Sequence, residues 1–198
     1  MALASGVILA GGHSRRLGRN KALVRIGGVP LIERVAGRLR ELSDDLLIVT
    51  NTPDLYRGLG GRLIGDVCPG MGSLGGIYSG LAVARHERAL VVGCDMPFLN
   101  PALLSHMIEL SEQFDVVIPS FDGYKEPLHA VYGLACLAPI AAQLRSGDLR
   151  IISFLSQVRV CYLERAELER LDPQLLSLFN VNTPQDLERA QELAATRR

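Results

Sequence analysis

The chain has 198 residues, of which 48% are hydrophobic and only 5% are aromatic. A chain of this length can bury a substantial core in one domain, and its aliphatic composition favours an α/β protein over a β-sandwich with an aromatic core. The 21 basic and 21 acidic residues give a net charge of zero, so we expect no general attraction to nucleic acid or to an acidic membrane surface. A phosphate-bearing ligand would have to be bound by a local group of charges.

The cysteines and the N-terminal segment indicate the compartment. The 4 cysteines are far apart and form no CxxC pair, which argues against a zinc site or a redox dithiol and favours reduced, partly buried thiols. The N-terminus lacks the charged region and apolar run of a signal peptide, and no stretch approaches the ~20 apolar residues that cross a bilayer. We expect a soluble, cytoplasmic protein without a membrane segment.

Strands and helices alternate in the first 120 residues of the predicted structure. Apolar runs predict strands at 5–10, 46–50, 62–65, 89–94 and 115–120, and helical spacing predicts helices at 31–42, 74–85 and 101–113. Asn100 is expected to cap the third of these helices, with Pro101 at its first position. Such alternation predicts a three-layer, Rossmann-like α/β fold with a mostly parallel central sheet.

The pattern changes after residue 120. Strands are predicted at 127–134 and 158–163, helices at 137–145 and 184–195, and a segment of unassigned type at 149–156. Thr183 and Pro184 provide a cap and a first residue for the last helix. No repeat or linker divides the chain, so we expect one domain over residues 1–198 with a small C-terminal lobe or sheet edge.

The strongest chemical signal is the loop at 11–21, which follows the first predicted strand. It contains glycines, arginines and Lys21 but no acidic residue. Glycines let backbone N–H groups approach an anion, and the cations offset the charge of a polyphosphate. The loop is not a Walker A motif, because Lys21 lies three residues after Gly18 and Ala22 replaces the required Ser or Thr. A solvated basic turn is the alternative interpretation.

Three further polar residues stand at the ends of predicted strands. Asp95 follows the apolar run at 89–94, and Asn51 and Asp66 follow the second and third strands. Because parallel strands end at one edge of a sheet, these side chains and the 11–21 loop are expected to converge. Asp95 is well placed to hold Mg²⁺ against a triphosphate, since Mg²⁺ takes one or two carboxylates plus phosphate oxygens. Each residue alone could equally be an ordinary turn or cap residue.

Two other patterns are weaker. Residues 70–75 match G-x-G-x-x-G, but they follow the third strand rather than the first, so an NAD site is not favoured. Asn180 and Asn182 precede the last helix and are candidates for ligand contacts or for simple turn residues. No Ser-His-Asp or Cys-His arrangement is visible, so covalent catalysis is not indicated.

These motifs together resemble one enzyme family, the molybdenum cofactor guanylyltransferases. The similarity runs in order along nearly the whole chain and covers LAGG at 9–12 with Arg16, Leu17, Gly18 and Lys21, then GSLGGI at 72–77, CDMPFL at 94–99, EPLHAVY at 126–132 and FNVNTP at 179–184. The opening and CDMP motifs also occur in variant form in sugar-nucleotide pyrophosphorylases. LAGG and NVNTP favour the cofactor branch.

The resemblance implies transfer of GMP from GTP to the terminal phosphate of molybdopterin, with release of pyrophosphate. Residues 5–120 would form the nucleotide half and 121–195 the acceptor half. The implied nucleotide contacts are Leu9, Ala10, Gly11, Gly12, Lys21, Asn51, Asp66 and Asp95; Asn180 and Asn182 would face the pterin, and Arg16, Lys21 and Asp95 would be catalytic. Mg²⁺ on Asp95 is the expected metal, and molybdenum-insertion proteins and molybdoenzyme chaperones are further expected partners.

Three departures from the family pattern affect the hypothesis. Asn20 replaces the usual acid before the lysine, Leu17 replaces methionine, and Ser73 replaces proline and could alter base selectivity. The alternatives are a molybdopterin cytidylyltransferase, a sugar-1-phosphate nucleotidylyltransferase, or a non-catalytic carrier of nucleotide or cofactor.

Overall fold

The computed structural model describes residues 3–11 and 20–196. Its strands are β1 (Ser5–Leu9), β2 (Arg25–Ile26), β3 (Val29–Pro30), β4 (Leu46–Val49), β5 (Arg62–Ile64), β6 (Arg88–Gly93), β7 (Val116–Phe121), β8 (Tyr124–Lys125), β9 (His129–Gly133) and β10 (Val160–Leu163). Its α-helices are α1 (Leu31–Arg40), α2 (Gly72–Ala82), α3 (Pro101–Leu110), α4 (Leu137–Ser146), α5 (Arg165–Leu171) and α6 (Pro184–Ala195). Short 3₁₀ helices include η1 (Lys21–Leu23), η2 (Pro53–Leu59) and η4 (Ile151–Gln157).

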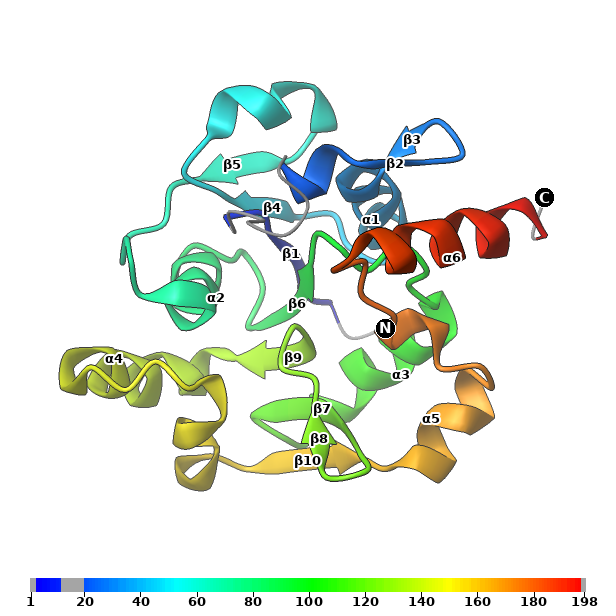
Figure 1. The fold of residues 1–198 in the computed structure, drawn as a ribbon. Helices are drawn as coiled ribbons and strands as arrows, with labels where there is room; N and C mark the ends of the chain where they lie inside the picture. Colours follow the sequence, from blue (N-terminus) through cyan, green and yellow to red (C-terminus); the bar gives the residue numbers. More distant parts are fainter. Residues whose placement is uncertain (1–2, 12–19, 197–198) are drawn as a thin grey trace.

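One mixed sheet organises the molecule (Figure 1). Its strand order is β10-β7-β9-β6-β1-β4-β5, and β8 pairs with β7 as a hairpin. β1 pairs in parallel with both β4 and β6, so the carboxyl ends of these strands meet at one edge of the sheet. β9 lies antiparallel between β6 and β7. The predicted, mostly parallel three-layer fold is confirmed.

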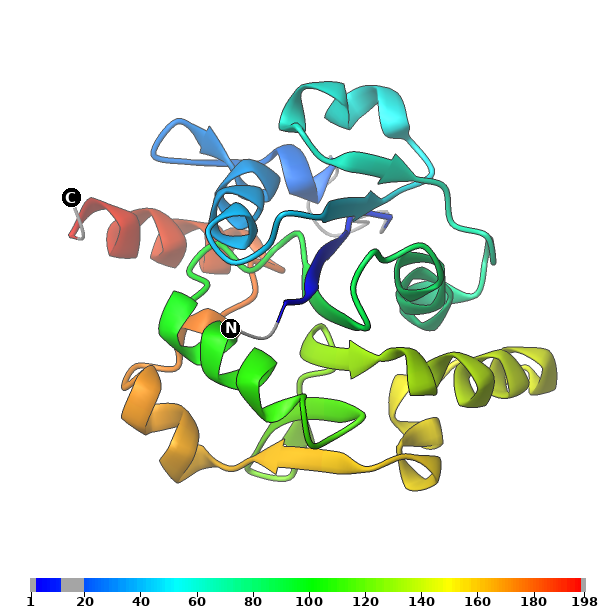
Figure 2. The same cartoon turned by 180° about the vertical axis from the view of Figure 1, so that it is seen from behind.

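Helices cover both faces of the sheet, as the views from front and back show (Figures 1 and 2). Successive residues of β1 point to opposite faces, so Ile8 packs in the core beneath α1 and α3 while Val7 packs in the core beneath α2 and α4. A third, smaller core joins the β2–β3 hairpin to α6 through Ile26, Val181 and Ala190. The C-terminal helix is thereby attached beside the N-terminal half of the chain.

Helix α2 approaches the sheet unusually closely. A methyl group on Gly80 would lie 2.6 Å from Val7 Cγ1, and one on Gly76 would lie 3.3 Å from Leu9 Cδ2. Glycine at these two positions therefore permits the contact between helix and sheet. This explains why α2 is rich in small residues.

The structure corrects several predicted boundaries. The helix predicted at 74–85 begins two residues earlier, at Gly72, because the glycine-rich motif is itself the first turn of the helix. Of the two forms expected for the C-terminal part, a lobe or a sheet edge, the structure has the sheet edge, since β9 and β10 pair with β7. The segment at 149–156 forms the 3₁₀ helix η4. Short or irregular apolar patterns hid the β2–β3 hairpin, β8 and α5 from the sequence analysis.

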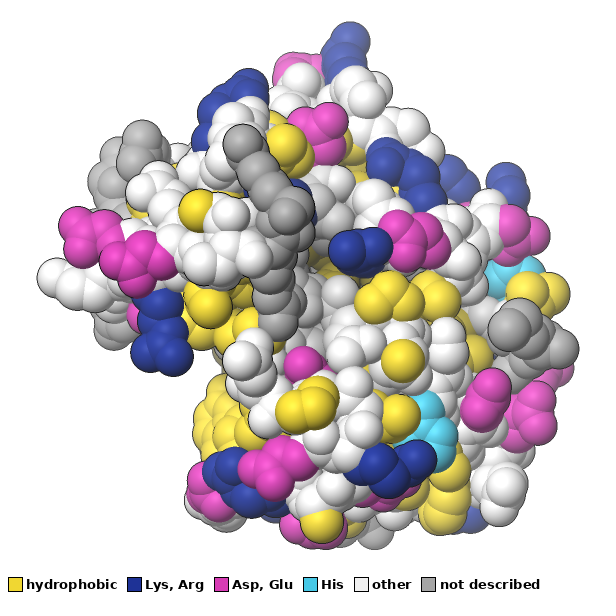
Figure 3. All heavy atoms as spheres, turned by 90° about the vertical axis from the view of Figure 1, so that its right-hand side faces the viewer, with side chains coloured by type: hydrophobic (Ala, Val, Ile, Leu, Met, Phe, Trp, Pro, Cys, Tyr) yellow, Lys and Arg dark blue, Asp and Glu magenta, His cyan; other side chains and the backbone are white. Residues whose placement is uncertain are grey.

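The described residues also show how apolar the helices are and how charge is distributed on one face of the surface. Within residues 3–11 and 20–196, none of the helices combines the length and apolarity needed to cross a bilayer. On the face shown in Figure 3, the basic and acidic side chains are interspersed, and the described residues there form no broad area of one charge. On this face, positive and negative side chains are therefore mixed, and the whole chain has a net charge of zero.

Candidate functional site

A pocket of about 850 Å³ lies at the carboxyl ends of β1, β4, β5 and β6. We call this edge of the sheet the rim. Its size falls within the range typical of small-molecule sites. The residues that line it come from the segments predicted to converge, and include Leu9, Ala10, Gly11, Lys21, Asn51, Asp66, Asp95 and Asn182. The predicted convergence of four segments at one edge is therefore confirmed.

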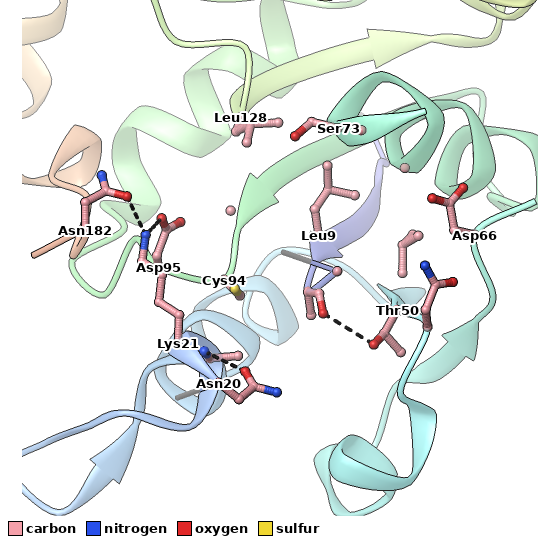
Figure 4. Close-up of a pocket in the computed structure, with 18 of the residues that line it drawn as sticks. Leu9, Asn20, Lys21, Thr50, Asp66, Ser73, Cys94, Asp95, Leu128 and Asn182 are labelled. Atoms are coloured by element: carbon pink, nitrogen blue, oxygen red, sulfur yellow. Dashed lines mark hydrogen bonds and ion pairs between the residues drawn. The ribbon is translucent and has the colours of Figure 1, made fainter. Parts of the chain in front are cut away.

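Lys21 lies at the centre of the charged part of the pocket. Its ammonium forms an ion pair with Asp95 Oδ2 and donates a hydrogen bond of 2.6 Å to Asn182 Oδ1 (Figure 4). The side chains of Lys21 and Asp95 are only 14% and 16% exposed. Lys21 thus joins the end of β6 to the segment before α6, although Asn182 lies 161 residues after Lys21 in the sequence. A charge pair so little exposed interacts more strongly than one on an open surface.

The backbone around Asp95 is shaped for this arrangement. A methyl group on Gly93 would collide with Asp95 Oδ1, so glycine lets the carboxylate fold back over the strand end. The Asp95 carbonyl accepts a 3.0 Å hydrogen bond from Val181 N. Both the side chain and the main chain of Asp95 are therefore connected to the 180–182 segment.

Asp66 lies on the other side of Leu9 from Lys21 and Asp95 (Figure 4). Its Oδ1 accepts hydrogen bonds from Cys68 N at 2.9 Å and from Ser79 Oγ at 3.0 Å. Asp66 therefore stabilises a turn, as the sequence allowed, and it also lines the pocket. The carboxylates of Asp66 and Asp95 therefore lie on opposite sides of the pocket in this view.

The first turn of α2 forms a further wall. Gly72, Ser73 and Gly76 line the pocket, and the first turn contains no acidic residue. Backbone N–H groups at a helix N-terminus favour an anion, and no acidic residue within the first turn opposes them here. The motif that resembled a dinucleotide fingerprint is therefore part of the same pocket, reached from the third strand rather than the first.

Known proteins similar to this chain carry nucleotidyltransferase names. Residues 6–160 match the model of the MobA-like NTP transferase domain. The chain belongs to this family. A probable molybdenum cofactor guanylyltransferase of Pelotomaculum thermopropionicum is 41% identical over 198 residues, covering 100% of this chain and 97% of the relative. The molybdenum cofactor guanylyltransferase of Desulfosudis oleivorans is 40% identical, covering 94% of both chains.

Solved structures agree with this assignment. The crystal structure of molybdopterin-guanine dinucleotide biosynthesis protein A from Archaeoglobus fulgidus is 31% identical, with a TM-score of 0.86 over 97% of this chain and 99% of that chain. The 2-C-methyl-D-erythritol 4-phosphate cytidylyltransferase of Thermus thermophilus, at 21% identity and a TM-score of 0.72, covers 98% of this chain and 99% of that one and shares the fold.

Asn20, which departs from the family pattern, has a local explanation. Its side chain accepts from Ala22 N at 3.1 Å, capping η1, and its Nδ2 donates to Tyr56 Oη at 2.9 Å. An amide can both accept and donate, so Asn20 anchors η1 to the buried Tyr56 and places Lys21 at the rim. Gly12, Arg16 and Leu17 of the MobA-like opening motif lie outside the described residues.

Cys94 and Thr50 are pocket residues that the sequence analysis did not select. Desolvation, and then the negative charge of Asp95, raise the pKa of the Cys94 thiol to about 12. A neutral thiol is a poor nucleophile, in agreement with the absence of an indicated covalent step. Thr50 Oγ1 donates to the Ala10 carbonyl at 3.3 Å and joins β1 to β4. In the sequence, the available signal was that Thr50 is the polar last residue of the predicted strand at 46–50.

The second predicted acceptor residue, Asn180, does not line the pocket in the described chain. Its Nδ2 donates to Glu126 Oε2 at 3.2 Å and to the Leu178 carbonyl at 3.3 Å.

Glu126 is 5% exposed, and burial raises the pKa of its carboxyl. His129 is also buried, because β9 carries it into the sheet. The buried Glu126 is the polar residue that sequence reasoning missed, although an acid directly before an apolar strand was visible.

Proposed function

We propose that this chain transfers GMP from GTP to molybdopterin, forming the molybdopterin guanine dinucleotide and pyrophosphate. One observation carries the proposal: Lys21, Asp95 and the acid-free N-terminus of α2 line a single pocket at the strand ends. The full-length similarity to proteins named molybdenum cofactor guanylyltransferase supports the choice of donor and acceptor. Binding and catalysis at such a site rest on positioning and charge neutralisation.

In the proposed mechanism, a phosphate oxygen of the acceptor attacks the α-phosphorus of GTP in line with the departing pyrophosphate. The bond from the α-phosphorus to the bridging oxygen breaks as the new bond to the acceptor oxygen forms. The acceptor phosphate is already ionised at neutral pH, so no strong base is required. Lys21 exchanges its ion pair with Asp95 for phosphate oxygens, and Arg16 adds a second cation from the 11–21 loop.

Mg²⁺ is part of the proposal, and Asp95 is its proposed ligand. Among the described residues, no three His, Cys, Asp or Glu side chains gather into a ready-made metal site. A single carboxylate fits Mg²⁺, which commonly takes one or two carboxylates and completes its shell with phosphate oxygens and water. When bound, the ion would offset the charge of the triphosphate. The space that Gly93 leaves for the Asp95 carboxylate supports this assignment.

We assign the nucleotide to residues 5–120 and the acceptor to residues 121–195 of one domain. Leu9, Ala10, Gly11, Gly12, Asn51 and Asp66 would contact the nucleotide, and Asn180 and Asn182 the acceptor. The Lys21–Asn182 hydrogen bond supports this division, because it places the 180–182 segment beside the catalytic cation. All 4 cysteines are free thiols, in keeping with a cytoplasmic site of action. Molybdenum-insertion proteins and molybdoenzyme chaperones remain proposed partners.

The proposed reaction is tested by combining different nucleotide donors with different acceptors. Purified protein with Mg²⁺ is given GTP, CTP or UTP as donor and molybdopterin or a sugar 1-phosphate as acceptor, and pyrophosphate release is measured. We expect multiple turnovers with GTP and molybdopterin alone. Turnover with CTP and molybdopterin would indicate a cytidylyltransferase, and turnover with a sugar phosphate a pyrophosphorylase. Nucleotide binding by calorimetry without pyrophosphate release would indicate a non-catalytic carrier.

A further inference from the structure

Glu126 is the buried charged group next to the site that the proposed mechanism does not use. It precedes β9, and its carboxyl group is surrounded by hydrogen-bond donors. Leu128 N donates to Oε1 at 3.2 Å, and Tyr124 Oη and Asn180 Nδ2 each donate to Oε2 at 3.2 Å. Leu128 lines the pocket, so the carboxylate lies directly behind its wall. A buried carboxylate with three donors is well satisfied and holds each donor in a fixed position.

The contact with Glu126 fixes which end of the Asn180 amide is available. One hydrogen of Nδ2 is directed to Glu126 and the other to the Leu178 carbonyl. A reversed amide would turn its oxygen toward these two acceptors, so the observed orientation is strongly favoured. In the described part of the chain no donor reaches Asn180 Oδ1. Asn180 can therefore offer a ligand only a hydrogen-bond acceptor.

Asn180 itself does not line the pocket, but the two residues that follow it are attached to residues of the rim. Val181 N donates to the Asp95 carbonyl at 3.0 Å, and Asn182 Oδ1 accepts from Lys21 at 2.6 Å. The segment is thus attached to the catalytic carboxylate, to the catalytic cation and, through Asn180, to Glu126. We give the two asparagines different roles. Asn182 contacts Lys21, the proposed phosphate-binding cation, and Asn180 has a side-chain carbonyl that can accept a hydrogen bond.

We infer that Glu126 is a positioning residue that orients Asn180 so that its carbonyl accepts a hydrogen bond from an N–H group on the acceptor's heterocycle. This inference rests on the proposed function and deepens it. It excludes a role for Asn180 in binding the acceptor phosphate, because both Nδ2 hydrogens are occupied. Glu126 itself touches no reacting atom.

Glu126→Gln is the decisive variant. Glutamine keeps the size of the side chain, but its NH₂ group must face either Leu128 N or Asn180 Nδ2, and both of these are donors; among the three present partners only the Tyr124 hydroxyl can also accept. We expect the KM for molybdopterin to rise about tenfold, the loss typical of a misplaced hydrogen-bonding group, while the KM for GTP changes less than about twofold. Asp45→Asn is the matched control, since Asp45 is an equally buried carboxylate at the amino end of β4, away from the rim.

A double-mutant cycle separates orientation from simple structural support. Asn180→Ala should raise the acceptor KM by a similar factor, and Glu126→Gln added to Asn180→Ala should have little further effect. Additive effects in the cycle, or an unchanged acceptor KM in Glu126→Gln, would overturn the inference. If Glu126→Gln does not fold, an unchanged acceptor KM in Asn180→Ala alone overturns it.

A spectroscopic measurement keeps this inference distinct from the proposed function. The Asn180 side-chain NH₂ resonances, assigned by their loss in Asn180→Ala, should shift in Glu126→Gln and stay in place in Asp45→Asn. If the parent chain makes no product but these resonances shift, the proposed reaction fails and the positioning role stands. If the resonances do not move, Glu126 does not orient Asn180, whatever the activity.

Discussion

The two halves of the molecule use their polar residues differently. In the proposed nucleotide half, residues 5–120, Lys21, Asp66 and Asp95 line the pocket at the strand ends. In the proposed acceptor half, residues 121–195, Glu126 and His129 are buried, at 5% and 0% exposure.

We infer from this difference that the buried polar residues of the second half hold other residues in position and do not contact a ligand themselves. His129 Nε2 is 2.7 Å from Ser177 Oγ, and Ser177 N donates to Asp172 Oδ2 at 2.7 Å. These buried contacts hold the chain that leads into the 180–182 segment, so the second half positions a few groups instead of presenting many. Substitutions should therefore affect turnover most in the nucleotide half and stability or acceptor binding most in the other half.

Replacing Lys21 by alanine should have the largest effect on turnover. Lys21→Ala removes the charge that contacts both Asp95 and Asn182, and we expect kcat to fall about 10²- to 10³-fold, as when one preorganised group is lost from a transition state. The unfolding temperature should stay close to that of the parent. Steady-state pyrophosphate release with Mg-GTP and molybdopterin measures the effect. Arg57→Ala, a change of an exposed cation on η2, is the control and should keep parental turnover. A fully active Lys21→Ala protein would remove Lys21 from the mechanism.

Acid should destabilise the folded state through the acceptor half. Burial lowers the pKa of His129 from 6.5 to about 4, so between these values the unfolded chain binds a proton that the folded chain does not. The free energy of unfolding should therefore fall as pH falls through this window, by ~1.4 kcal/mol per pH unit from this residue. Above pH 6.5 the contribution should be constant.

Urea unfolding at pH 7, 6 and 5 tests this prediction. His129→Gln can keep a polar contact to Ser177 but cannot take up a proton, so its stability should depend less steeply on pH than that of the parent. Comparing the slopes cancels the contributions of carboxyl groups common to both proteins. Parallel slopes would mean that His129 does not set the acid sensitivity.

Most of the fold and the position of the pocket residues at the strand ends could be predicted from the sequence, for a physical reason. Parallel strands are buried apolar runs, and the residue after each run must lie at a common edge, so Asp95 and Asn51 could be placed without coordinates. The role of Glu126 could not be predicted, because its partner Asn180 is 54 residues away and a single acid carries no periodic signal. The Lys21–Asn182 contact, between residues even further apart, was hidden in the same way.

Close packing of α2 on the sheet offers a smaller but sharper test in the nucleotide half. Gly80→Ala would place a methyl group 2.6 Å from Val7 Cγ1, and the overpacking should cost about 1–3 kcal/mol of unfolding free energy. Gly37→Ala is the matched control within helix α1, where a methyl group meets nothing within 4 Å. It should stabilise the protein by roughly 0.5–1 kcal/mol, since alanine favours the helix. Urea unfolding of both variants should give changes of opposite sign; equal changes would show that α2 does not depend on its glycines.

The smallest expected effect concerns the choice of base at the first turn of α2. Ser73 lines the pocket at the second position of the helix, where proline fits because a first-turn N–H has no partner within the helix. Ser73→Pro should fix the backbone of this turn, and hence the direction of its remaining N–H groups, without touching Lys21 or Asp95. We expect the preference for GTP over CTP, taken as the ratio of their kcat/KM values, to rise about two- to fivefold, or ~0.4–1 kcal/mol. The parent and Ser73→Ala serve as controls. If Ser73→Ala produces the same change, the hydroxyl and not the backbone selects the base; if neither variant changes the ratio, the base is recognised elsewhere in the pocket, with Asp66 at its far end the next residue to vary.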